Sequence, residues 1–162
     1  LLIREQSYFT YNRIEKNMPL VVYKMERNGI KLSSIALQKI SEDFTLKLAK
    51  LEEKIYIKAG CQFNIASPKQ LGEILYEKLS LPLLQKKSKT GAFVTDAETL
   101  EELSDLGYDI ADLVLEWRQI AKLKSTYTDS LIKKVNPLTL RIHSNFSLNS
   151  TSTGRLSSSH PN

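Results

Sequence analysis

Apolar residues recur every three or four positions through two long stretches of this sequence, and this spacing limits the fold more than any other feature. Such steps keep apolar side chains on one face of an α-helix. The first stretch predicts a helix over about residues 34–58, with an apolar face of Leu37, Ile40, Phe44, Leu48, Leu51 and Ile55. The second predicts a helix over about residues 110–135, whose apolar face contains Leu113, Trp117, Ile120 and Tyr127. We therefore expect a mainly α fold.

Shorter helices are indicated by residues that start or stop a helix. In residues 18–30, Pro19 suits a first helical turn and Asn28-Gly29 suits a left-handed C-terminal cap. Ser33 and Ser34 offer N-caps for the long helix that follows. The segment 1–16 also has helical character.

Two further helix starts have the spacing of a capping box, in which residues three apart bond each other's backbone. Ser67 and Gln70 have this spacing at the start of SPKQLGEIL, residues 67–75. Thr95 and Glu98 have it in TDAETLEEL, so we expect Thr95 to cap a helix there.

The last part of the chain has a different pattern. Residues 140–151, LRIHSNFSLNST, alternate partly between apolar and polar side chains, which predicts short extended strands rather than a helix. The segment TSTGRLSSS, residues 151–159, then combines Arg155 with many hydroxyls. This segment is either a flexible Ser/Thr tail or a surface that contacts a nucleic-acid backbone.

Composition excludes several classes. The chain has 162 residues, enough for one domain with a core, or one domain and part of another. No apolar run reaches the length of a membrane span. The single cysteine, Cys61, rules out an internal disulfide and a Cys-based metal site. The net charge of +5 favours an anionic partner, of which nucleic acid is the commonest. The start, LLIREQSY, has neither a methionine nor a signal peptide, so we expect it to come from the middle of a longer protein.

Nothing in the sequence forms a catalytic site by itself. The acids Asp96, Glu98, Glu101 and Glu102 fall in the first turns of a predicted helix, where they complement the helix dipole. His143 and His160 lack metal-ligand spacing. No Gly-rich phosphate loop, Ser-His-Asp arrangement or activated cysteine is present.

The second long helix carries a cationic stripe. Arg118, Lys122 and Thr126 follow one another at i, i+4, and Lys124 and Ser125 lie beside them. Such a stripe is either a solvated helix face or a surface for phosphates, since lysine and arginine supply charge while hydroxyls supply short hydrogen bonds. A basic loop with Lys86, Lys87 and Lys89 lies between the predicted helices.

Four ordered motifs resemble the family A DNA polymerases, in their bacterial form. They are MPLVVYKMERNGIKL (18–32), FNIASPKQLGEILYEKLSLP (63–82), AKLKSTYTDSL (121–131) and STSTGRLSSSHPN (150–162). The resemblance implies that residues 1–17 end a 3′–5′ exonuclease-like domain and residues 18–135 form the thumb, with two long antiparallel helices and small helices at its tip. Residues 136–162 would begin the palm. The family's metal-binding carboxylate motifs lie further on, so we expect a fragment that is inactive alone.

The resemblance also implies site residues and partners. A primer-template duplex would be held through its backbone and minor groove by Arg118, Lys122, Lys124, Ser125, Thr126, Thr153, Arg155, Ser157, Ser158 and Asn162. The parent enzyme would be a monomeric, cytoplasmic, nucleoid-associated DNA-directed DNA polymerase that acts in replication and repair and uses Mg²⁺ and dNTPs. We expect no cofactor in this fragment.

Two positions depart from the family pattern. His160 stands where the family usually has an acidic residue, and Thr139-Leu140 stands where it often has Thr-Gly, which predicts an altered turn. The alternative function is a helical protein-interaction module with no nucleic-acid role, in which the two amphipathic long helices pair with a partner.

Overall fold

The computed structural model describes residues 3–82 and 93–161. It divides the chain into two compact units. Unit 1 is formed by residues 1–37 and 130–162, and unit 2 by residues 38–129. We describe each unit by itself.

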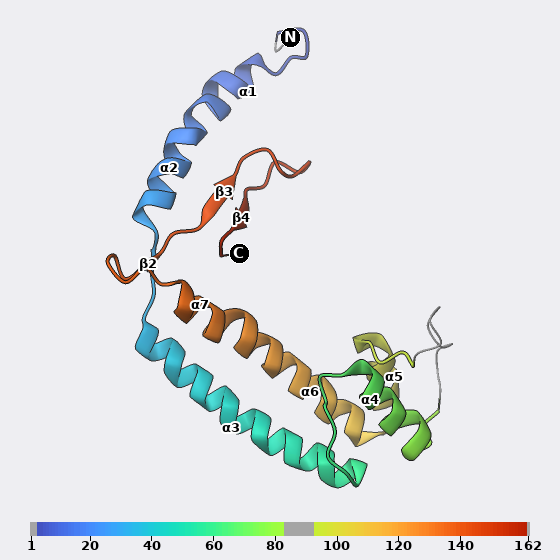
Figure 1. Cartoon of the computed structure of the whole chain (residues 1–162). Coiled ribbons are helices and arrows are strands. Elements are labelled where there is room, and N and C mark those ends of the chain that lie inside the picture. The colour runs from blue at the N-terminus through green and yellow to red at the C-terminus, as the bar shows by residue number, and fades with distance from the viewer. Residues whose placement is uncertain (1–2, 83–92, 162) are drawn as a thin grey trace. The chain divides into compact units, whose positions relative to one another are not determined.

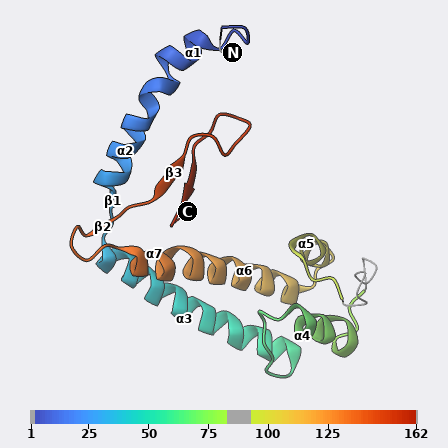
Figure 2. The ribbon, with the colours of Figure 1, turned by 45° about the horizontal axis from the view of Figure 1, so that its top comes forward.

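Unit 2 is built on two long antiparallel helices, as the sequence predicts. These are α3 (Ser34–Ala59), which begins in unit 1, and α6 (Asp109–Leu123), which continues through the π-helical turn η3 (Lys124–Thr128) into α7 (Asp129–Lys134). Figures 1 and 2 both show α3 and α6 side by side. Two side-chain bonds between the helices show that they run antiparallel, because the later residue of α3 bonds the earlier residue of α6. Glu52 Oε1 accepts from Trp117 Nε1 at 3.0 Å, and Lys58 Nζ lies 2.7 Å from Asp109 Oδ2.

Small helices cover one end of this pair. They are α4 (Pro68–Gly72), the π-helical segment η2 (Glu73–Lys78) and α5 (Ala97–Asp105). The core of unit 2 lies where these helices meet α3 and α6, because that is where apolar faces come together from several directions. Its fully buried side chains include Ile55, Leu71, Leu75, Leu100, Leu103 and Val114.

Two residues of the predicted apolar faces are exposed instead. Ile40 is 42% exposed, because the core of unit 2 gathers at the other end of α3, around Ile55 and Ala59. Tyr127 is 50% exposed. It lies inside η3, where one extra residue per turn rotates the later side chains around the helix axis.

The helix starts differ from the predicted capping boxes in their partners. The Ser67 hydroxyl accepts from the Gln70 amide as expected, but Gln70 Oε1 accepts from the backbone N–H of Asn64, at 2.7 Å, rather than from that of Ser67. At α5 the cap is Asp96, whose carboxylate accepts from the Thr99 amide at 2.9 Å. Thr95 is therefore not the cap, and its hydroxyl faces Arg118 instead.

Unit 1 contains helices at the start of the chain and two small antiparallel sheets. The helices are α1 (Tyr8–Arg13), the 3₁₀ turn η1 (Glu15–Asn17) and α2 (Met18–Asn28). Strand β1 (Ile30–Lys31) pairs with β2 (Arg141–Ile142), and β3 (Asn145–Ser147) pairs with β4 (Ser157–Ser159). The predicted β-leaning segment is confirmed, although part of the Ser/Thr-rich tail also forms a strand. No helix in the described ranges is long and apolar enough to cross a membrane.

The end of α2 is joined tightly to the strands that follow residue 140. Gly29 has a φ of +64°, and a Cβ there would lie 2.7 Å from the carbonyl oxygen of Ile142, so a larger residue cannot fit. The Nδ1 of His143 donates to the Glu26 carbonyl at 2.8 Å, and the Glu26 carboxylate accepts from the Phe146 amide at 2.7 Å. Gly29 is the C-cap of α2 and has a positive φ as predicted, but its ψ of 179° lies outside the left-handed helical region.

The turn before β2 keeps a left-handed residue without a glycine. Leu140 has a φ of +55° and is 62% exposed. Its amide donates to the Asn136 carbonyl at 2.8 Å, while the Asn136 side chain accepts from the amides of Leu138 and Thr139. These bonds hold Leu140 in a conformation that costs an L-residue roughly 1–2 kcal/mol.

Replacing Leu140 by glycine is expected to raise the free energy of unfolding by about 0.5–1 kcal/mol. The substitution removes the left-handed penalty, and the greater freedom of glycine in the unfolded chain offsets part of that gain. Urea unfolding followed by circular dichroism measures the change. Leu140→Ala is the control, because alanine keeps the penalty and should not stabilise the chain. A loss of stability with glycine would contradict the strained-turn interpretation.

Candidate nucleic-acid interface

Part of the cationic stripe on α6 and η3 is exposed to solvent. The side chains of Lys122, Ser125 and Thr126 are all exposed. The Ser125 hydroxyl lies 3.4 Å from the Lys122 carbonyl oxygen. One ammonium group and two hydroxyls are therefore presented to solvent within about one turn of helix, a combination suited to an anionic backbone.

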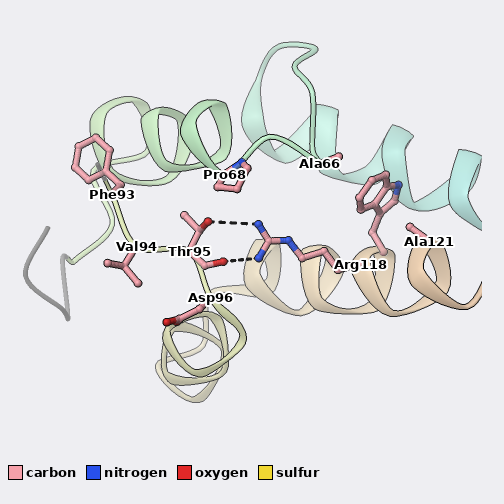
Figure 3. A pocket seen from close by; sticks show the side chains of 9 residues that line it. Ala66, Pro68, Phe93, Val94, Thr95, Asp96, Arg118 and Ala121 are labelled. Carbon is pink, nitrogen blue, oxygen red and sulfur yellow. Dashed lines mark hydrogen bonds between the residues drawn. The ribbon is translucent and has the colours of Figure 1, made fainter. Parts of the chain in front are cut away.

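Arg118 belongs to the same stripe, but part of its guanidinium is used inside unit 2. Figure 3 shows it pointing at Thr95, with Nη1 bonded to the Thr95 carbonyl and Nη2 lying 3.3 Å from the Thr95 hydroxyl. Thr95 is buried, and burial lowers the pKa of the Arg118 guanidinium, while the charge of Asp96 opposes that shift. Arg118 thus fastens the segment before α5 to α6.

The Arg118–Thr95 bonds lie in an open cavity of about 580 Å³. Its walls are mostly apolar and are formed by Ala66, Pro68, Phe93, Val94, Trp117 and Ala121, with Asp96 at its edge. These walls come from α6 and from the segments that begin α4 and α5. The cavity therefore lies where the small helices pack against α6.

Lys124 is also partly withdrawn from solvent. Its Nζ lies 2.7 Å from Asp129 Oδ2, and its side chain is 23% exposed. The bonds from Lys124 and from the Ser41 hydroxyl lower the pKa of the Asp129 carboxyl. Sequence spacing placed Lys122 and Lys124 together, but the structure pairs Lys124 with an acid and leaves Lys122 exposed.

The second group of predicted residues lies on the β3–β4 hairpin of unit 1. Thr153 and Arg155 are exposed in its loop, and Ser157 and Ser158 lie in β4. Hydroxyls of this segment bond one another and the backbone: Ser150 pairs with Ser157, and Thr151 donates to the Arg155 carbonyl at 2.7 Å. Gly154 has a φ of +73°, which favours glycine at that position. Asn162 and the basic loop with Lys86, Lys87 and Lys89 lie outside the described residues.

The structure identifies residues that sequence reasoning missed. Thr95 and Asp129 hold the two partly buried cations of the cationic stripe, and Glu26 fastens α2 to β3. Asp129 follows Lys124 at i+5, the spacing of one π turn and not of an α-helix, so the regular helix expected from the sequence gave no signal for this pair. No spacing rule connects Thr95 to Arg118. Within residues 3–82 and 93–161, no three His, Cys, Asp or Glu side chains form a group that could hold a metal ion.

Comparisons with known proteins agree on one family. The sequence model described as DNA polymerase family A matches residues 34–162. The chain is 46% identical over 152 residues to DNA polymerase I of Rhizobium leguminosarum, which covers 94% of this chain and 15% of that protein. It is 45% identical over 152 residues to DNA polymerase I of Bacillus subtilis, covering 94% and 17%. The chain therefore spans less than a fifth of the length of these relatives.

A solved structure has the same fold. It is the POL domain of Pol1 from M. smegmatis, in complex with DNA primer-template and dNTP. The TM-score is 0.83 at 33% sequence identity, and the match covers 99% of this chain and 28% of that one.

Arg118→Lys is expected to lower the free energy of unfolding by about 1–2 kcal/mol. A lysine cannot supply the planar fork that serves both Thr95 acceptors, so one buried acceptor loses its partner. Guanidinium chloride unfolding measures the loss. Lys122→Ala on the same helix is the control, because an exposed side chain should change stability by less than about 0.5 kcal/mol. Equal effects of the two substitutions would contradict a structural role for Arg118.

Proposed function

This chain belongs to DNA polymerase family A, and from that premise we propose that it forms the thumb and the start of the palm of a DNA polymerase. Residues 1–17 would end an exonuclease-like domain, residues 18–135 would form the thumb, and residues 136–162 would begin the palm. The antiparallel α3–α6 pair with small helices at one end supports this division.

We propose that the thumb holds a primer-template duplex by its sugar-phosphate backbone. The observation that carries the proposal is the exposed set of Lys122, Ser125 and Thr126 within about one turn of helix. Arg118 adds to this set, because its guanidinium has five N–H donors and two of them bond Thr95. Phosphate contacts carry no sequence information, which suits an enzyme that must copy any template.

On the β3–β4 hairpin, Arg155 would reach the minor groove, with Thr153, Ser157 and Ser158 contacting the backbone nearby. Asn162, outside the described residues, would contact the duplex near the active site of the full enzyme. Minor-groove acceptors occur in both A·T and G·C pairs, so an arginine there tests the shape of a pair without selecting its sequence. The exposure of Arg155 supports this role. The M. smegmatis relative, bound to DNA primer-template and dNTP, supports a duplex as the partner. We expect the parent enzyme to act as a monomer at the bacterial nucleoid.

The family's metal chemistry does not fit the described residues of this chain. The Asp96 carboxylate is bonded to Thr99, and the Asp129 carboxylate is bonded to Lys124. In the described ranges, no three His, Cys, Asp or Glu side chains come together as a group that could hold a metal ion.

Duplex binding by the 162-residue chain is expected to weaken steeply with salt. About four phosphate contacts give a slope of roughly −3 to −4 in a plot of log K against log salt. Lys122→Ala should weaken binding on every duplex sequence and make the slope shallower by about 1. Fluorescence anisotropy with a labelled primer-template measures both quantities.

The matched control is Lys50→Ala, which removes the same charge from an exposed position on α3. The salt slope of Lys50→Ala should stay nearer to that of the unaltered chain than the slope of Lys122→Ala does. Binding that does not respond to salt would contradict the backbone-contact proposal. Self-association independent of DNA would instead favour the interaction-module alternative.

The purified chain is expected not to extend a primer when Mg²⁺ and dNTPs are added. The donor set of the described residues does not assemble a metal site. A gel assay with a labelled primer measures extension, and a complete family A polymerase serves as the positive control. Mg²⁺-dependent extension by this chain would overturn the expectation.

A further inference from the structure

The helix that carries the cationic stripe is not regular where its hydroxyls lie. Residues Lys124–Thr128 form a π turn, in which each N–H bonds a carbonyl five residues back. The extra residue shifts every later side chain by roughly 100° around the axis compared with an uninterrupted α-helix. The turn buries Thr128, at 4% exposure, and leaves Ser125, Thr126 and Tyr127 exposed.

A π turn is rare, and side-chain contacts around this one converge on Asp129. Asp129 Oδ1 accepts from the Ser41 hydroxyl of α3 at 2.6 Å. Asp129 Oδ2 pairs with Lys124 Nζ at 2.7 Å, at the opposite end of the turn. The Thr128 hydroxyl donates to the Lys124 carbonyl at 2.8 Å and lies 3.4 Å from Asp129 Oδ1.

The Asp129 carboxylate therefore connects Lys124, its own residue and α3. It joins the first residue of the turn to the residue that follows the turn, and it anchors both to α3. Charged hydrogen bonds of this length are stronger than neutral ones, and Asp129 is only partly exposed. The bonds from Lys124 and Ser41 also keep the Asp129 carboxyl ionised by lowering its pKa.

We propose that Asp129 is a positioning residue for duplex binding: it holds the π turn so that Ser125 and Thr126 face the DNA beside Lys122. The proposal rests on the proposed function of the thumb. Asp129 itself would make no contact with DNA. It acts through the backbone of residues 124–128.

Positioning and simple charge predict opposite results when Asp129 is neutralised. Asp129→Asn removes a negative charge and releases Lys124, so electrostatics alone would tighten binding to a polyanion and steepen the salt dependence. If Asp129 positions the turn, the same substitution weakens duplex binding roughly fivefold and makes the salt slope shallower. Anisotropy titrations of the 162-residue chain at several salt concentrations distinguish the two.

The matched control is Asp109→Asn. Asp109 forms a lysine pair of the same length, 2.7 Å to Lys58, and also joins α6 to α3, but at the far end of α6 from the π turn. Its neutralisation should leave affinity unchanged or slightly higher. Ser41→Ala is the second variant, because it cuts the bond to α3 while keeping both charges, and it should weaken binding at least twofold.

Weaker binding by Asp129→Asn and Ser41→Ala, with no weakening by Asp109→Asn, supports the proposal. Unchanged or tighter binding by Asp129→Asn overturns it. If circular dichroism shows that Asp129→Asn has lost its helices, Ser41→Ala decides alone, and unchanged affinity overturns the proposal.

The failure of the proposed function has a different signature. In that case the unaltered chain itself shows no salt-sensitive duplex binding. Amide hydrogen exchange across residues 124–128 then still tests whether Asp129 holds the π turn. Faster exchange in Asp129→Asn than in Asp109→Asn supports its hold on the turn, and equal exchange in the two variants overturns it.

Discussion

The register of α3 against α6 is the constraint on which unit 2 depends. Side-chain bonds fix it at both ends and in the middle, from Lys58 with Asp109, through Glu52 with Trp117, to Ser41 with Asp129. A slide of one helical turn would break all three and would move Val114 out of the core that the small helices close. Because the register is fixed, the side chains of the cationic stripe keep one orientation relative to α3.

Most of the fold could be predicted from local patterns. The two long helices followed from apolar spacing, and the end of α2 followed from Asn28-Gly29. Two of the errors involve a contact distant in sequence. Tyr127 was assigned to the core because a regular helix was assumed, whereas it lies in a π turn that is followed by Asp129, which Ser41 of the other helix bonds. Thr95 was assigned as a cap because its bond to Arg118, 23 residues away, has no local signature.

The same limit applied to the candidate site. Residue type and spacing identified Arg118, Lys122 and Lys124 as one basic stripe, but could not show which cations were already paired. The structure ranks them: Lys122 is exposed, Arg118 is half-buried on Thr95, and Lys124 is paired with Asp129. A basic helix face thus combines side chains that meet solvent with side chains that keep the helix in shape.

The pairing of β1 with β2 affects how the whole chain tolerates changes of length. The chain leaves unit 1 after β1 and returns to it before β2, so the strand pair Ile30–Ile142 closes the loop that contains all of unit 2. The entropy of closing a loop grows only with the logarithm of its length. Insertions or deletions among the small helices of unit 2 therefore leave the entropy of closing this strand pair almost unchanged.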